Sequence, residues 1–131
     1  MIDNNQVGQA GEYLTACVLQ RHFQAIAFPH IPTAYDILAH HKSSAFLKCQ
    51  VKTAEKTTNI KGSKYWQFKT RKKSKMYDDT EVDFFALVVL PKRIVTFLSK
   101  ADATGQFYLR EADATPEKEQ KTLVDVLGSY I

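Results

Sequence analysis

Residues 45–53 read Ala45-Phe46-Leu47-Lys48-Cys49-Gln50-Val51-Lys52-Thr53, and polar and apolar side chains alternate along them. Alternation with a period of two is typical of a β-strand, because successive side chains point to opposite faces of a sheet. The pattern therefore predicts a strand with two faces of opposite polarity. The apolar face holds Leu47, Cys49 and Val51, and the polar face holds Lys48, Gln50 and Lys52.

A second strand is predicted just upstream, where the chain reads Ala34-Tyr35-Asp36-Ile37-Leu38-Ala39. The polar segment 40–44 that joins the two strands is short enough for a hairpin connection. Pairing of these strands would bring Asp36 close to Gln50 and Lys52. A carboxylate and an amide oxygen can hold a hard cation, and a lysine opposes the charge that develops on phosphate, so this trio suits metal-assisted phosphodiester cleavage. Each residue taken alone fits an ordinary surface position at least as well.

The combination resembles the PD-(D/E)XK nuclease superfamily. The signature of that superfamily is an acid, a variable gap and then acid-x-lysine on the following strand, with a glutamate from an N-terminal helix. Asp36 corresponds to the first acid and Lys52 to the lysine, while Glu12 in Gly8-Gln9-Ala10-Gly11-Glu12 corresponds to the helical glutamate. The sequence departs from the signature at Gln50, where the superfamily has its second acid.

A Gln-x-Lys version of the motif is known in a branch that looks like the group I intron homing endonucleases of this fold. The likeness to that branch is carried by Tyr35-Asp36-Ile37-Leu38, Gln50-Val51-Lys52-Thr53-Ala54 and Val82-Asp83-Phe84-Phe85-Ala86. The compact length and the Gly-x-x-Gly-Glu start also look like archaeal-type Holliday junction resolvases, which normally keep an acid at the position of Gln50.

The resemblance implies a DNA endonuclease that depends on Mg²⁺ or Mn²⁺. Asp36, Gln50 and Glu12 would be the metal ligands, with the Val51 backbone carbonyl as a further neutral ligand. Lys52 would complete the catalytic set by stabilising charge on the scissile phosphate and favouring the hydroxide form of the attacking water. The amide at Gln50 removes one negative charge, which should weaken metal affinity and make Glu12 more important. One such site per chain would cut both DNA strands only in a homodimer or a higher assembly such as a homotetramer.

Positive charge is concentrated in the segment that contains and follows the predicted active strand. Of the 18 Lys and Arg and 14 Asp and Glu residues, eleven basic and one acidic lie within 42–77, which gives +10 there and −6 (seven basic, thirteen acidic) elsewhere. This distribution is typical of polyanion binding, although a solvated lysine-rich loop would look the same. The predicted DNA-contacting residues are Lys48, Lys61, Lys64, Lys69, Arg71, Lys72, Lys73 and Lys75.

The fold class predicted from the remaining pattern is α/β (α+β), with a restriction-endonuclease-like core and a mixed central β-sheet flanked by N- and C-terminal helices. Apolar residues at three- and four-residue steps predict the first helix over 5–23, capped by Asn4 or Asn5. Gly8 and Gly11 in its first turns suggest a close approach of its backbone to the sheet or to phosphate.

Additional strands are predicted at 25–28, 64–70, 82–90, 93–98 and 106–109, with a loop at 57–63 and a basic loop or short helical turn at 71–75. The almost uninterrupted apolar run 82–90 is typical of a central strand that is buried on both faces. Thr115 and Pro116 predict the start of the last helix, with threonine as the cap and proline at the first helical position.

A length of 131 residues fits one nuclease-like domain, residues 1–131. No apolar run approaches the ~20 residues of a membrane span and no signal pattern is present, so no membrane partner and a cytoplasmic location are expected. Cys17 and Cys49 are expected to be reduced and buried, and they have no zinc-ligand spacing with the histidines. Two rivals to the enzyme remain: a non-catalytic nucleic-acid-binding module on the same fold, and a small α/β protein whose lysines only keep it in solution.

Overall fold

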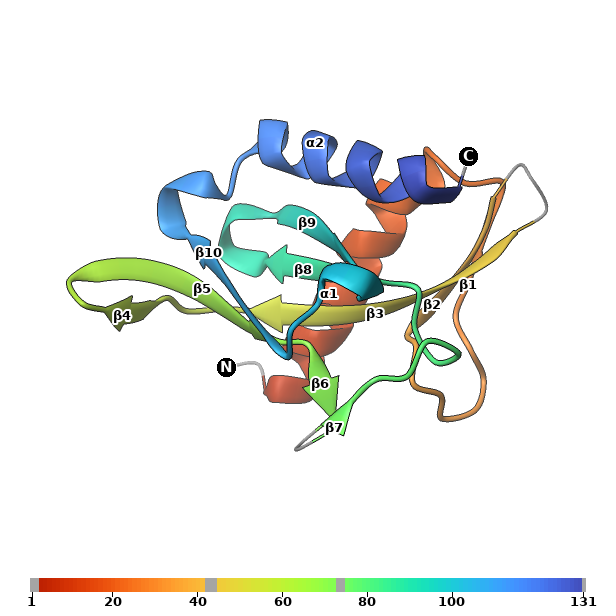
Figure 1. Ribbon diagram of the computed structural model, residues 1–131, viewed down its shortest axis with the longest axis horizontal. Helices are drawn as coiled ribbons and strands as arrows, with labels where there is room; N and C mark the ends of the chain where they lie inside the picture. Colours follow the sequence, from red (N-terminus) through yellow and green to blue (C-terminus); the bar gives the residue numbers. More distant parts are fainter. Residues whose placement is uncertain (1–2, 42–44, 73–74, 131) are drawn as a thin grey trace.

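The central layer of the protein is a mixed β-sheet (Figure 1). The computed structural model describes residues 3–41, 45–72 and 75–130. The helices and strands in these ranges are α1 (Asn4–Gln20), β1 (Ala25–Ala27), β2 (Ile37–His40), β3 (Phe46–Ala54), β4 (Thr58–Ile60), β5 (Ser63–Lys69), β6 (Arg71–Lys72), β7 (Lys75–Met76), β8 (Phe84–Val89), β9 (Ile94–Ser99), β10 (Gln106–Arg110) and α2 (Pro116–Leu127). The strand order is β1-β2-β3-β8-β9 in the central sheet and β10-β5-β4 in a smaller sheet, while β6 pairs with β7.

The middle of the central sheet is the parallel pair β3 and β8, and its other neighbouring strands are antiparallel. Every residue of β8 is buried, which confirms the central strand predicted from the apolar run 82–90. The alternation predicted for 45–53 is also confirmed, because the polar side chains at Lys48, Gln50 and Lys52 are partly exposed and the apolar ones between them are buried.

Both helices cover the same face of the central sheet. Val18 and Leu19 of α1 and Leu123 of α2 pack with the apolar side chains of β3, β8 and β9. Figure 1 shows α2 lying along β9, and α1 crossing behind β3 and β8. The small sheet covers the opposite face, where Trp66 and Phe68 of β5 are buried against β8. The predicted fold class is confirmed, with the addition that the strand predicted at 64–70 belongs to this second sheet.

Two segments predicted to be loops form short strands. Residues 57–63 contain β4, which pairs with β5 through a two-residue turn at Lys61 (φ 51°) and Gly62 (φ 86°). Two successive positive φ values are typical of a type I′ hairpin turn, whose twist matches that of the strands. In the segment 71–75, β6 and β7 pair with each other rather than forming a helical turn, and residues 73–74 lie outside the described ranges.

The start of α1 differs from the prediction by one residue. Asp3 is the cap: its side chain accepts the Gln6 backbone N–H, and the Gln6 side chain accepts the Asp3 N–H in return. The cap predicted at Thr115 is confirmed, since its hydroxyl accepts the Lys118 N–H. Cys49 is buried as expected, but Cys17 is exposed because it lies on the outer side of α1.

Within the described ranges, neither helix is long and apolar enough to cross a membrane.

Candidate active site

Asp36 lies at the point where β2 separates from β3. Its backbone N–H donates to the Cys49 carbonyl (2.8 Å), and its Oδ2 accepts the backbone N–H of Val51 (2.8 Å). The Asp36 carboxylate therefore accepts the hydrogen bond that a backbone carbonyl of β2 would accept if the regular pairing of β2 with β3 continued. Regular pairing ends at Ile37 and Cys49, which is why the strand predicted to begin at Ala34 begins at Ile37. The site forms where the sheet opens.

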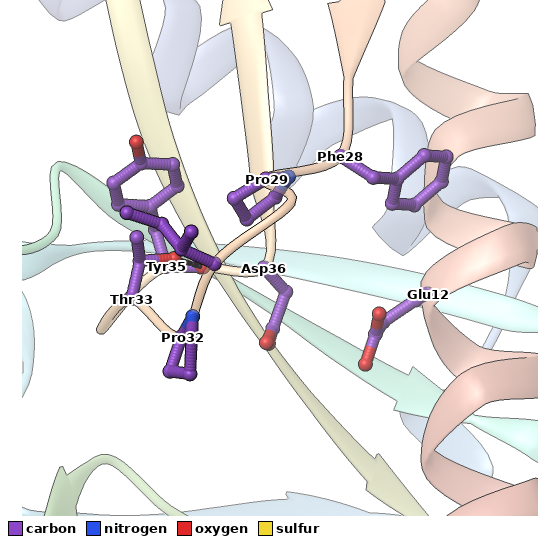
Figure 2. Close-up of a pocket in the computed structure, with 8 residues that line it drawn as sticks. Glu12, Phe28, Pro29, Pro32, Thr33, Tyr35 and Asp36 are labelled. Atoms are coloured by element: carbon purple, nitrogen blue, oxygen red, sulfur yellow. Dashed lines mark hydrogen bonds between the residues drawn. The ribbon is translucent and has the colours of Figure 1, made fainter.

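Helix α1 brings Glu12 to the same opening. A Cβ atom at Gly11 would lie 1.9 Å from Oγ1 of Thr53 on β3, so only glycine lets the helix approach the strand this closely. The close approach suggested for Gly11 is thus confirmed, whereas a Cβ at Gly8 would meet nothing within 4 Å. Figure 2 shows the carboxyl groups of Glu12 and Asp36 extending into one cavity, whose volume is about 230 Å³.

The two carboxyl groups have raised pKa values. Burial, followed by the charge of Asp36, raises the pKa of Glu12 from 4.5 to about 7. Burial also raises the pKa of Asp36, although the Val51 N–H and the positive charge of Lys52 act in the opposite direction. Both shifts arise mainly from burial, which disfavours the charged form of each carboxyl group. A divalent cation between these groups would favour the charged forms.

Gln50 reaches Asp36 from the other face of the sheet. It lines a second cavity of about 490 Å³ together with Asp36, Tyr77 and Glu81. Its Nε2 donates to the backbone carbonyl of Val51 (3.3 Å). Half a turn about the last side-chain bond would exchange the amide nitrogen and oxygen. Gln50 and the Val51 carbonyl would then present two oxygens side by side at the edge that β2 has left. We call the two cavities, which meet at Asp36, the acidic cleft.

Lys52 is held beside this cleft by Tyr77. Its Nζ donates to the Tyr77 hydroxyl (3.1 Å) and lies 5.3 Å from the centre of the ring. The ring is 6% exposed and packs edge-on against Phe85 of β8, so its position is set by the core. Lys52 is also near enough to Asp36 for its charge to lower the pKa of that carboxyl. The structure therefore brings Lys52 to the site.

Lys48 leaves the same face of β3 but goes elsewhere. Its Nζ donates to the carbonyl of Thr80 (2.7 Å), and its backbone N–H donates to Oδ2 of Asp83 (2.7 Å). Asp83 thus ties β3 to the start of β8, which is a structural role. The ammonium group of Lys48 is thus bound to the loop before β8, 6.0 Å from the centre of the Tyr35 ring.

The predicted catalytic residues are brought together around Asp36 but not into a single pocket. Glu12 and Gln50 each share a cavity with Asp36, but they approach it from opposite faces of the sheet and share no cavity with each other. Across the ranges that the structure describes, no group of three or more His, Cys, Asp or Glu side chains could hold a metal ion. The groups near Asp36 that could hold a cation are the carboxylates of Asp36 and Glu12 and, after rotation of its amide, the oxygen of Gln50 beside the Val51 carbonyl.

The predicted DNA-contacting residues lie on several surfaces. Lys72 forms an ion pair with Glu81 and lies 5.5 Å from the centre of the Tyr77 ring. Lys73 lies outside the described residues. The exposed members of the set are Lys61, Lys64, Lys69, Arg71, Lys72 and Lys75.

The sequence analysis did not assign Tyr77 and Glu81 to the site. Tyr77 orients Lys52, and Glu81 lines the acidic cleft and neutralises Lys72. The position of Tyr77 directly before the Asp78–Glu81 turn carries no motif that would have shown its contact with β3, which is 25 residues away.

The architecture is that of a homing-endonuclease fold. The solved structure of the bacterial homing endonuclease I-Ssp6803I matches this chain with a TM-score of 0.71; the match covers 99% of this chain and 96% of that one, at 16% sequence identity. At this identity the likeness establishes a shared fold. The sequence itself matches no protein-family model and no curated protein.

Proposed function

We propose that the protein is a Mg²⁺- or Mn²⁺-dependent DNA endonuclease with a PD-(D/E)XK-type site. The observation that carries the proposal is the position of Asp36. It shares one cavity with Glu12 and another with Gln50, and it lies within electrostatic reach of Lys52. The shared fold with a bacterial homing endonuclease supports the same class of activity and favours a site-specific enzyme.

The chain's own residues suit a hard cation. Asp36 and Glu12 would supply carboxylate oxygens from partly buried groups whose charged form a bound cation would favour, and Gln50 and the Val51 carbonyl would supply neutral oxygens. Bound Mg²⁺ would polarise the scissile phosphate and assist the attacking water. Asp36 is already oriented by the Val51 N–H, so little rearrangement of its side chain is needed.

Lys52 would act on the phosphate. Its ammonium group is held by the Tyr77 hydroxyl at the edge of the acidic cleft, where it can stabilise the charge that develops on the phosphate oxygens. It would also favour the hydroxide form of a water molecule beside it. Cleavage of both strands would use two copies of the chain, because the described residues form one such cleft per chain.

The test is nicking of supercoiled plasmid with Mg²⁺ and with chelator. Lys52→Met should abolish metal-dependent nicking, whereas Lys48→Met on the same strand face should retain it because that ammonium group is bound to Thr80. Equal loss in both variants would contradict the assignment of Lys52. A four-way DNA junction is tested as a second substrate. A junction-resolving enzyme would cut the junction in preference to the plasmid, whereas a site-specific endonuclease would not.

A non-catalytic DNA-binding module is the second candidate. It is favoured by the neutral Gln50 and by the lack, within the described ranges, of a three-residue His, Cys, Asp or Glu cluster. Salt-sensitive DNA binding without cleavage in Mg²⁺ or Mn²⁺ would identify the module.

A further inference from the structure

A groove of about 520 Å³ lies where the end of β3 meets β4 and β5. Its floor includes the buried side chains of Ala54 and Phe68. The complete lining is Lys52, Thr53, Ala54, Lys56, Thr58, Gln67, Phe68 and Lys69. We call it the lysine groove. Lys56 and Lys69 are exposed, and Lys52 is partly exposed.

The charge of the lysine groove is uniformly positive. Its lining, all of it within the described ranges, contains three lysines and no acidic residue. The ion pairs found among the described residues involve Lys72, Lys100 and Lys121, so no carboxylate is in contact with the lysines of the groove. Glu55 is exposed and does not line it. Ammonium groups gathered in a concave surface raise the local positive potential and attract polyanions.

The groove adjoins the acidic cleft through one side chain. Lys52 lines the groove, and its Nζ donates to the hydroxyl of Tyr77. Tyr77 in turn lines the cleft with Asp36 and Gln50. A strand that leaves the acidic cleft beside Tyr77 would therefore meet Lys52 and then a lining that contains no acidic residue.

We propose that the lysine groove binds the backbone phosphates that flank the scissile phosphate of a DNA strand lying in the acidic cleft. This inference rests on the proposed function. The three lysines come from different segments: β3, the turn after it, and β5. A groove that receives lysines from three segments suits an extended anion better than a single phosphate ion. The Thr58 hydroxyl and the Gln67 amide add neutral donors for phosphate oxygens. Lys56, which the sequence analysis did not select, becomes a DNA-contacting residue.

The test is the salt dependence of DNA binding in the full chain, measured in EDTA so that cleavage plays no part. The variants are Lys56→Ala, Lys69→Ala and the double variant. Lys121→Ala is the control, because it removes the same charge from α2 on the other side of the central sheet. The probe is a fluorescein-labelled DNA duplex, followed by anisotropy over a series of KCl concentrations. Thermal melting establishes that each variant is folded.

Each groove variant should reduce the slope of log K against log[KCl] by about 0.9, and the double variant by about twice that, since each phosphate contact contributes this amount on duplex DNA. Lys121→Ala should leave the slope unchanged. Unchanged slopes in the groove variants, or an equal change in the control, would overturn the proposal.

Two further measurements separate other ligands. Competition by inorganic phosphate beyond that of chloride at equal ionic strength would show a single-anion site and contradict the extended groove. The second measurement repeats the salt series with an RNA duplex of the same sequence. If the groove variants change the slope of log K against log[KCl] for RNA but not for DNA, the assignment to DNA is overturned. Binding is measured without metal, so its result does not depend on cleavage. If the groove variants alter the slopes but the protein never cuts DNA, the proposed endonuclease activity is refuted while DNA binding by the groove is supported.

Discussion

The acidic cleft and the lysine groove meet at Lys52 but carry opposite charge. The acids of the cleft come from α1, from the loop before β2 and from the turn before β8, whereas the lysines of the groove come from β3, the turn after it and β5. The acidic residues and the lysines of these two regions thus lie on either side of the Tyr77 side chain, and we propose that the first region binds the cation and the second binds the polyanion. Substitutions on one side should therefore affect cleavage, and substitutions on the other should affect affinity for DNA.

The largest effect is expected for Asp36→Asn, which acts on the cleft alone. Cleavage should fall by about 10³-fold or more, because the site loses a charge needed to hold the cation. The asparagine oxygen can still accept the Val51 N–H, so the fold should be retained, whereas Asp36→Ala would leave that N–H unpaired at a cost of about 1–3 kcal/mol. Single-turnover nicking and anisotropy in EDTA are the measurements. DNA affinity that falls along with cleavage would mean that the two regions are not separable.

Glu12→Gln should reduce cleavage by roughly 10²-fold while it stabilises the metal-free protein at pH 8. The folded-state pKa of Glu12, about 7, lies above the unfolded value of 4.5. The folded state therefore holds this proton more tightly, and the resulting stability is present below pH 4.5 and is lost as the pH rises to 7. Removing the group should add about 1 kcal/mol at pH 8, after allowance for the solvent exposure of Glu12.

Urea unfolding of both proteins at pH 5 and pH 8 measures this difference. The stability gain of Glu12→Gln should be larger at pH 8 than at pH 5. A gain that is independent of pH would show that Glu12 does not titrate as stated. In the wild type, cleavage at limiting Mg²⁺ should rise with pH through about 7, and saturating Mg²⁺ should move that rise to lower pH.

Gln50→Glu adds one negative charge to the acidic cleft and leaves the lysine groove unchanged, which increases the difference in charge between the two regions. The Mg²⁺ concentration for half-maximal cleavage should fall by roughly tenfold, because a third carboxylate strengthens the attraction for the cation. DNA binding in EDTA should weaken slightly through repulsion. Titration of cleavage with Mg²⁺ measures the effect. A raised Mg²⁺ requirement would indicate that Gln50 is not directed toward the cation.

Tyr77→Phe should have the smallest effect, since it changes only the boundary between the two regions. The ring contacts with Phe85 and Lys52 remain, but Lys52 loses the acceptor of its hydrogen bond. The expected loss is about threefold to tenfold in kcat with little change in KM, because the lysine is still present but less well oriented. A shift of KM alone would place the role of Tyr77 in DNA binding.

Much of the framework could be predicted from local pattern. The faces of β3, the burial of β8 and the helix start at Thr115 follow from periodicity and from capping chemistry, which act over neighbouring residues. The likeness of motifs also selected Glu12, Asp36, Gln50 and Lys52. Whether these residues perform catalysis stays a prediction, although the structure brings the other three to Asp36.

Local pattern did not show which segments pair or which contacts each lysine makes. The segment 57–63 forms a strand because the turn at Lys61 and Gly62 returns the chain to pair as β5, and the Lys48 ammonium group is bound by a carbonyl 32 residues away. Periodicity treats Lys48 and Lys52 alike, since both leave the same face of one strand. The motif spacing selected Lys52, and the positions of Tyr77 and Thr80 in the folded chain give the two lysines different partners.

Order along the chain thus specified which faces are apolar, where helices begin and which residue types are available for chemistry, because these depend on neighbours a few residues apart. Folding alone decided which carboxylates share a cavity, why their pKa values rise and how three lysines come to line one groove. Electrostatic interactions and burial depend on distance in space, and that distance is set by packing of α1 and the small sheet on β3 and β8.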